Sequence, residues 1–143
     1  MWVPSRNGMT RHRKGGSRPP EEIAAIGRAK ERLDRLSLYP IPVSTERVRI
    51  LHTAWLFRIP GFRRFRGYEV GPLILTRRPL KDVSDDLVVH ELCHVWQSQH
   101  RCLRMWLSYL YRGYRMNPYE VEARDAVRAT RGVTGSPRGP ARV

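Results

Sequence analysis

The stretch VVHELCHVW at residues 88–96 decides how the rest of this chain is interpreted. His90 and His94 are four residues apart, so on a helix they lie on one face and can bind the same metal ion. Glu91 lies beside them, where its carboxylate can take a proton from a water held by that metal. The flanking residues are apolar, so the pattern predicts the buried active-site helix of a zinc hydrolase.

The start of this predicted helix is equally well marked. Ser84 can cap the first turn, where Asp85 and Asp86 suit the positive end of the helix dipole. Two histidines and a glutamate would be costly to bury on such a helix unless they shared a partner. We therefore expect a catalytic Zn²⁺ site, which needs three protein ligands and one open position for water.

The third ligand must come from another part of the chain. Asn117 and Pro118 begin a second predicted helix, which runs to about residue 131. Glu120 and Glu122 flank the inward face of this helix on opposite sides, so periodicity does not choose between them. That inward face is formed by Tyr119, Ala123, Ala126 and Val127.

Taken together, HELCHVWQ at 90–97 and NPYEVEA at 117–123 resemble the short, soluble gluzincin-type zinc peptidases. In that class a glutamate from a downstream helix, often in an E-x-x-A setting, completes the HExxH site. Glu120 stands in that setting before Ala123, and the resemblance covers roughly residues 45–131.

The resemblance implies that His90, His94 and Glu120 hold zinc while Glu91 acts as the general base of peptide hydrolysis. Many of those families place an aspartate after the alanine, whereas this chain has Arg124. The group that supports the zinc histidines is therefore left open.

His100 offers an alternative third ligand. It follows His90 by ten residues in HELCHVWQSQH, which resembles the long zinc motif of metzincins, and residues 116–118 resemble their methionine turn. That class has a glycine where this chain has Gln97, and a non-glycine residue in such a left-handed turn costs about 1–2 kcal/mol. We rank Glu120 first, His100 second and Glu122 third.

The rest of the chain predicts a single α+β domain over residues 20–131, between a disordered basic arm at 1–19 and a disordered tail at 132–143. An amphipathic N-terminal helix precedes a small sheet, the HExxH helix and the glutamate-bearing helix. Residues 68–78 are expected to form one strand, whose edge near Gly71–Thr76 aligns a peptide substrate. Residues 101–115 are expected to form a broadly packed helix.

The chain is strongly basic, with 27 Lys and Arg against 13 Asp and Glu and a net charge of +14. This balance, together with the arginine-rich arm at residues 1–19 through which nucleic acid could bind, supports a rival hypothesis, a basic nucleic-acid-binding module with structural zinc or none. Phe62 and Phe65, interleaved with arginines, could stack on single-stranded nucleic acid. We favour a solvated basic surface, with the two phenylalanines packed in the core, because the arginines are scattered along the sequence.

The leading interpretation is a zinc metallopeptidase that acts on peptides or proteins. Tyr109, Tyr111, Tyr114 and His100 are candidates to stabilise the oxyanion. The two cysteines are too few for a disulfide framework, and the N-terminus lacks the apolar core of a secretory signal. We therefore expect a cytoplasmic monomer without a membrane partner.

Overall fold

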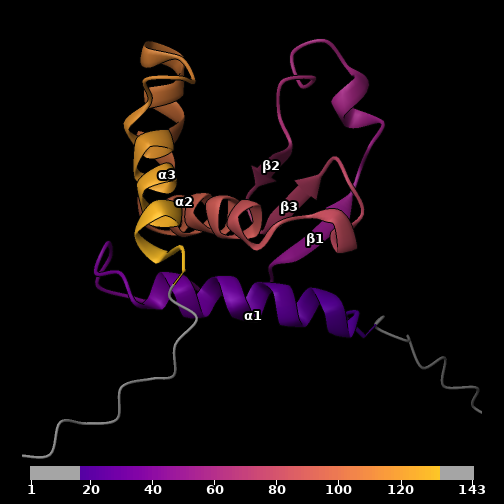
Figure 1. Cartoon of the computed structure of the whole chain (residues 1–143). Helices are drawn as coiled ribbons and strands as arrows, with labels where there is room; N and C mark the ends of the chain where they lie inside the picture. The colour runs from indigo at the N-terminus through magenta and orange to yellow at the C-terminus, as the bar shows by residue number, and fades with distance from the viewer. Residues whose placement is uncertain (1–16, 133–143) are drawn as a thin grey trace, which may run out of the picture.

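The computed structural model describes residues 17–132 of the 143-residue chain. The predicted basic arm, except for residues 17–19, and the predicted tail, except for residue 132, lie outside the described residues. The predicted α+β class is confirmed (Figure 1). The elements are α1 (Pro20–Asp34), β1 (Arg49–His52), β2 (Gly67–Val70), β3 (Leu73–Thr76), α2 (Asp85–Arg112) and α3 (Pro118–Thr130), with single 3₁₀ turns at Leu56–Arg58 and Leu80–Asp82. Among the described helices, none has an apolar stretch long enough to cross a bilayer.

The three strands form a mixed sheet in the order β1, β3, β2. The prediction of one strand over residues 68–78 is wrong, because the chain reverses between β2 and β3 at Gly71, where φ is +60°. Only glycine adopts that conformation readily, so the turn splits the segment into an antiparallel hairpin. The central strand is β3, which pairs in parallel with β1, and the strand at the edge beside α2 is β2.

The free edge of β2 presents backbone groups at regular intervals. The Arg77 amide donates to the Arg66 carbonyl over 3.0 Å, just beyond the paired residues Gly67 and Thr76. Bonded and non-bonded pairs alternate in an antiparallel ladder, so the backbone groups of Gly67 and Glu69 point away from β3.

Helix α1 lies beneath the rest of the domain and packs against α2 (Figure 1). Its small residues Ala25 and Ala29 allow close approach to α2, and they belong to the same buried core as Leu92 and Trp96. A buried carboxylate joins α1 to the sheet, because Glu22 accepts hydrogen bonds from the Ile50 amide (2.8 Å) and Arg49 Nε (3.0 Å). These contacts fix the position of α1, which supports the HExxH segment of α2.

Helix α2 contains a kink that separates two different environments. Arg101 has non-helical angles of φ −142° and ψ 36° inside the helix. The turns before it are buried in the core, whereas Leu103, Leu110 and Tyr111 after it are 74%, 77% and 82% exposed. The prediction that residues 101–115 pack broadly is therefore wrong. The kink redirects the second part of α2 upward beside α3 and away from α1, so most of its apolar side chains leave the core (Figure 1).

Candidate metal centre

The first part of α2 brings the two histidines together. Ser84 caps the helix by accepting a hydrogen bond from the Leu87 amide, as the sequence predicted. One turn of helix separates His90 from His94, and their Nε2 atoms lie 3.1 Å apart. Apolar residues on either side are buried in the core, which leaves the two imidazoles facing α3.

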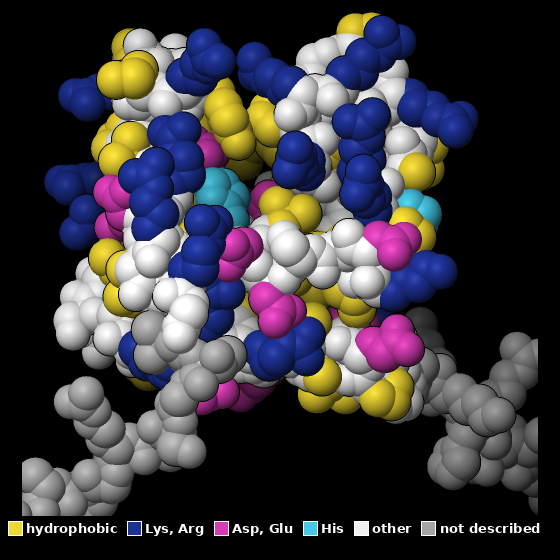
Figure 2. All heavy atoms as spheres, in the orientation of Figure 1, with side chains coloured by type: hydrophobic (Ala, Val, Ile, Leu, Met, Phe, Trp, Pro, Cys, Tyr) yellow, Lys and Arg dark blue, Asp and Glu magenta, His cyan; other side chains and the backbone are white. Residues whose placement is uncertain are grey.

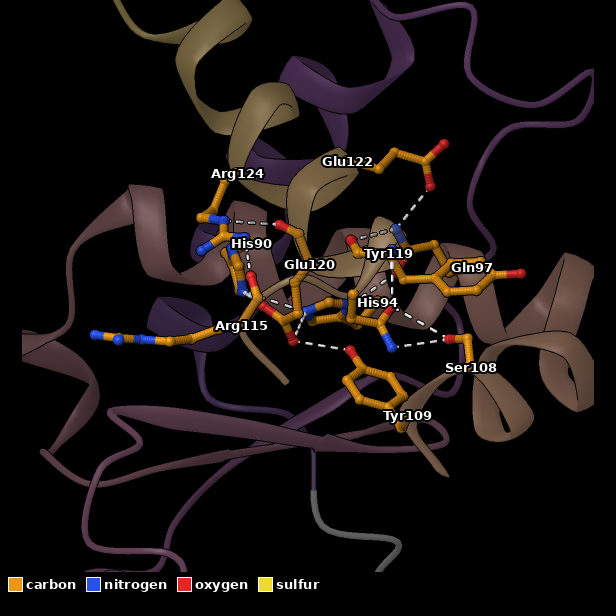
Figure 3. Close-up of polar contacts among 11 residues, drawn as sticks. His90, His94, Gln97, Ser108, Tyr109, Arg115, Tyr119, Glu120, Glu122 and Arg124 are labelled. Atoms are coloured by element: carbon orange, nitrogen blue, oxygen red, sulfur yellow. Dashed lines mark hydrogen bonds and ion pairs between the residues drawn. The ribbon is translucent and has the colours of Figure 1, made fainter. Parts of the chain in front are cut away.

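Helix α3 supplies Glu120 to the same point. Its start follows the prediction, because the Asn117 side chain accepts a hydrogen bond from the Tyr119 amide and Pro118 occupies the first position. Glu120 is only 3% exposed, and its Oε1 lies 3.2 Å from His94 Nε2 while its Oε2 lies 3.3 Å from His90 Nε2. The carboxylate therefore turns toward both imidazoles (Figure 3).

The spacing of these three groups fits a zinc ion. Among the described residues they are the one group of at least three His, Cys, Asp or Glu that could hold a metal, with ligand atoms within 4.8 Å of one another. Ligands placed tetrahedrally about 2.0–2.1 Å from zinc are separated by roughly 3.3–3.4 Å. The two Nε2 atoms are 3.1 Å apart, and each lies 3.2 or 3.3 Å from its nearer Glu120 oxygen, so each separation is close to that value although the two carboxylate distances end on different oxygens.

The charges within the cluster favour a bound cation. Burial would raise the pKa of Glu120, but hydrogen bonds from His90 and His94 hold that pKa well below its ordinary range. Burial would lower the pKa of His94, yet its contact with Glu120 raises it above the ordinary value. A buried carboxylate thus attracts positive charge to the imidazoles, and a metal ion supplies that charge without a proton.

Gln97, on the next turn of α2, fixes the orientation of His94. The fully buried Gln97 side chain donates through Nε2 to the Tyr119 carbonyl (3.0 Å) and to Glu122 Oε2 (2.7 Å). Its Oε1 must therefore face His94 Nδ1, at 2.7 Å, and accept a hydrogen from it. Nδ1 then carries a proton in every state, so Nε2 is the nitrogen that a metal would bind, in place of the proton that Nε2 donates to Glu120.

This supporting role of Gln97 was missed from the sequence, where the residue was noted only as a departure from the metzincin glycine. The available signal was an amide three residues after His94 on an otherwise buried face. Glu122, ranked third as a ligand, instead accepts from Gln97 and from the Tyr39 hydroxyl (2.8 Å). Arg124 donates to the backbone carbonyls of Glu120 and Arg115.

His100 lies away from the three clustered groups. Its Nδ1 is 2.9 Å from the Trp96 carbonyl, and its ring stacks on Tyr39 with 4.9 Å between ring centroids. The structure therefore favours Glu120 over both alternatives as the group that joins His90 and His94.

Glu91 lies beside the cluster on the same helix. It is 5% exposed, and burial raises the pKa of its carboxyl to about 7 despite the opposing effect of His94. Strand β2 passes so close that a Cβ added at Gly67 would lie 2.7 Å from Glu91 Oε1. Glycine at this position allows the strand to contact the carboxylate and to hold it in place.

A cavity of about 400 Å³ opens onto these groups. His94, Glu120 and Glu91 line its polar side. The other walls are largely aromatic and apolar, formed by Phe62, Phe65, Tyr68, Met105, Trp106, Tyr109 and Tyr114. The predicted core location of the two phenylalanines is therefore wrong, since both are partly exposed and line this cavity.

Two of the predicted oxyanion candidates lie in this cavity. The Tyr109 hydroxyl donates to Glu120 Oε1 over 2.8 Å (Figure 3), and Tyr114 also lines the cavity. Burial and the nearby Glu120 carboxylate raise the pKa of both phenols, so both remain hydrogen-bond donors at neutral pH. Tyr111 is 82% exposed and lies outside the cavity.

Comparisons with protein-family models, with curated proteins and with solved structures found no match for this chain. A functional assignment must therefore rest on the geometry and chemistry of the site.

Proposed function

We propose that this protein is a zinc-dependent peptidase of the HExxH type. The single observation that carries the proposal is the convergence of His90, His94 and Glu120 at zinc-ligand spacing, with Glu91 beside them and a cavity open to the site. Structural zinc sites are normally closed by four protein ligands. Three ligands, one neighbouring carboxylate and an accessible cavity suit catalysis better.

The residues have distinct roles in this proposal. His90, His94 and Glu120 would hold a zinc ion, which would supply a Lewis acid for the activation of water and the polarisation of a substrate carbonyl. Glu91 accepts the proton of the attacking water and passes it to the leaving amine.

Two further groups bind the substrate in this proposal. The outward backbone groups of Gly67 and Glu69 can pair with an extended peptide by strand addition beside Glu91. In this proposal the aligning edge is β2, because β3 is the central strand and the predicted edge at residues 71–76 does not exist. Tyr109 and Tyr114 line the cavity next to Glu120, and a phenol that moves its hydrogen bond from Glu120 to the substrate would stabilise negative charge on a carbonyl oxygen.

Substitution of the general base tests the proposal directly. Glu91→Gln preserves the size of the side chain but removes its basicity, so we expect zinc content to be retained and hydrolysis of a quenched-fluorescent peptide library to fall by about 10²–10⁴-fold. Glu46→Gln is the matched control, because Glu46 is exposed and lines neither cavity of the site. Full turnover by Glu91→Gln would refute the assignment of the base.

A further inference from the structure

A second cavity, of about 1130 Å³, adjoins the first and also has Glu91 in its wall. His90 and Glu91 lie in its wall, so it meets the aromatic cavity at the candidate metal centre. Figure 2 shows the cleft between two lobes, with Lys and Arg side chains on both rims and a histidine between them. We call this space the arginine groove.

The hairpin side of the groove carries four arginines, at positions 64, 66, 77 and 78. The guanidinium groups of Arg66 and Arg78 make no hydrogen bond or ion pair with any residue between 17 and 132. Arg77 donates to a backbone carbonyl, and Arg64 lies over the Phe65 ring at 4.9 Å and the Tyr114 ring at 5.5 Å. None of these four arginines forms an ion pair with a carboxylate of the described chain, although Asp82, Asp86 and Glu91 also line the groove.

The α3 side adds Arg124, Arg128 and Arg131. Arg124 donates only to backbone carbonyls, whereas Arg128 pairs with Asp125 and Arg131 pairs with Asp86. Five of the seven groove arginines thus lack a carboxylate partner among the described residues. The expectation of scattered surface charge needs correction here, because arginines distant in the sequence gather around one groove.

We propose that the arginine groove binds an acidic segment of a polypeptide substrate whose apolar side chain enters the adjoining aromatic cavity. This inference rests on the proposed peptidase function and names the substrate class of the same site. Guanidinium groups bind carboxylates through two parallel hydrogen bonds, so free arginines around a groove select for Asp and Glu side chains. Arg66 directly precedes Gly67, which contacts Glu91. An acidic residue bound by Arg66 would therefore lie close to the peptide bond that is cleaved.

Three observations favour an acidic polypeptide over a nucleic acid. The groove continues into a cavity walled by Phe62, Met105 and Trp106, which suits an apolar side chain and not a phosphate backbone. The free edge of β2 presents backbone groups that pair with another peptide backbone. The point at which both spaces meet holds Glu91, the proposed base of peptide hydrolysis.

The test measures binding separately from catalysis, using the full chain with Glu91→Gln, before and after zinc reconstitution. Its probes are fluorescein-labelled peptides with an Ala-Phe-Ala core flanked on both sides by Glu, by Gln or by Lys, and a labelled oligothymidylate of similar length. We expect the Glu-flanked peptide to bind at least about tenfold more tightly than the Lys-flanked peptide, with affinity that falls as salt rises.

Charge reversal locates the binding site. Arg66→Glu with Arg78→Glu should weaken binding of the Glu-flanked peptide by at least about tenfold. Arg47→Glu with Arg104→Glu is the matched control, because it changes the net charge equally at two exposed arginines outside the groove. The control should bind within about twofold of the parent, and circular dichroism should show that both double variants are folded.

The outcomes separate this inference from the proposed function. Zinc binding and hydrolysis by the wild type without any charge preference would overturn the groove assignment alone, as would equal weakening by both double variants. Tighter binding of the oligothymidylate, lost in Arg66→Glu with Arg78→Glu, would overturn it in favour of a nucleic-acid site. Charge-selective binding without zinc uptake or hydrolysis would support the groove and overturn the peptidase.

Discussion

Replacement of Gly67 by alanine should impair hydrolysis while leaving the metal ligands untouched. The new methyl carbon would lie 2.7 Å from Glu91 Oε1 and 3.1 Å from both Cδ and Cγ of the same side chain. Ordinary contacts between such atoms are about 3.4 Å or longer, so the carboxylate must shift by roughly 0.7 Å. A displacement of about 1 Å in a catalytic geometry can cost on the order of 10²-fold. We therefore expect turnover of Gly67→Ala to fall by about 10²-fold.

The assay measures peptide hydrolysis and zinc content together. The atoms nearest to a Cβ at position 67 all belong to Glu91, and none belongs to a proposed metal ligand. Gly27→Ala is the control, since a Cβ at Gly27 in α1 meets no atom within 4 Å and alanine favours a helix. That variant should match the wild type in both measurements. Wild-type turnover by Gly67→Ala would refute the positioning of Glu91 by β2, whereas parallel loss of zinc would show that the substitution acts through the ligands.

Two further predictions concern the support of the site and the pH dependence of folding. Gln97→Ala should lower zinc affinity by about 10–100-fold in a chelator competition, because His94 loses the acceptor that fixes its tautomer. The control Gln99→Ala, on the exposed side of α2, should leave zinc affinity unchanged. Equal zinc affinity in the two variants would contradict this role of Gln97. Asp86→Asn should reduce the free energy of unfolding in urea at pH 7 by about 0.5–1 kcal/mol, because Asp86 contacts Arg32 (2.9 Å) and Arg131 (2.8 Å) and remains partly exposed. Burial would raise the pKa of Asp86, but the two arginines hold that pKa below its ordinary value. The stabilisation of the fold by ionised Asp86 is therefore present at neutral pH and is lost as the pH falls through the lowered pKa. The difference between Asp86→Asn and the wild type should therefore narrow below about pH 4, and a constant difference would count against the ion pairs.

The local parts of the site could be predicted because each depends on residues close in sequence. The four-residue interval places His90 and His94 on one helical face, and Asn117 with Pro118 marks the start of the next helix. The choice between Glu120 and Glu122 depends on how α3 is rotated against α2. Helical periodicity predicts the direction of the inward face with an uncertainty about as large as the angle between Glu120 and Glu122, so it does not choose between them.

The remaining features depend on contacts between distant segments. The hairpin could not be predicted from the apolar pattern of residues 68–78. The chain reverses there because Gly71 adopts a positive φ, and that pattern gives no sign of the angle. The exposure of the second part of α2 follows from a kink at Arg101, a residue with no helix-breaking signature. The arginine groove is formed by the packing of the hairpin opposite α3, so its charges are separated by up to about half the chain in sequence.

The measurement that tests the central claim most directly is metal content by elemental analysis after zinc reconstitution. Wild-type protein, Glu120→Ala and His100→Ala should be purified and analysed side by side. We predict about one zinc ion per chain in the wild type and in His100→Ala, and loss of zinc in Glu120→Ala, because Glu120 is the one carboxylate between residues 17 and 132 that contacts both His90 and His94. A wild type without zinc, or loss of zinc in His100→Ala with retention in Glu120→Ala, would contradict the account.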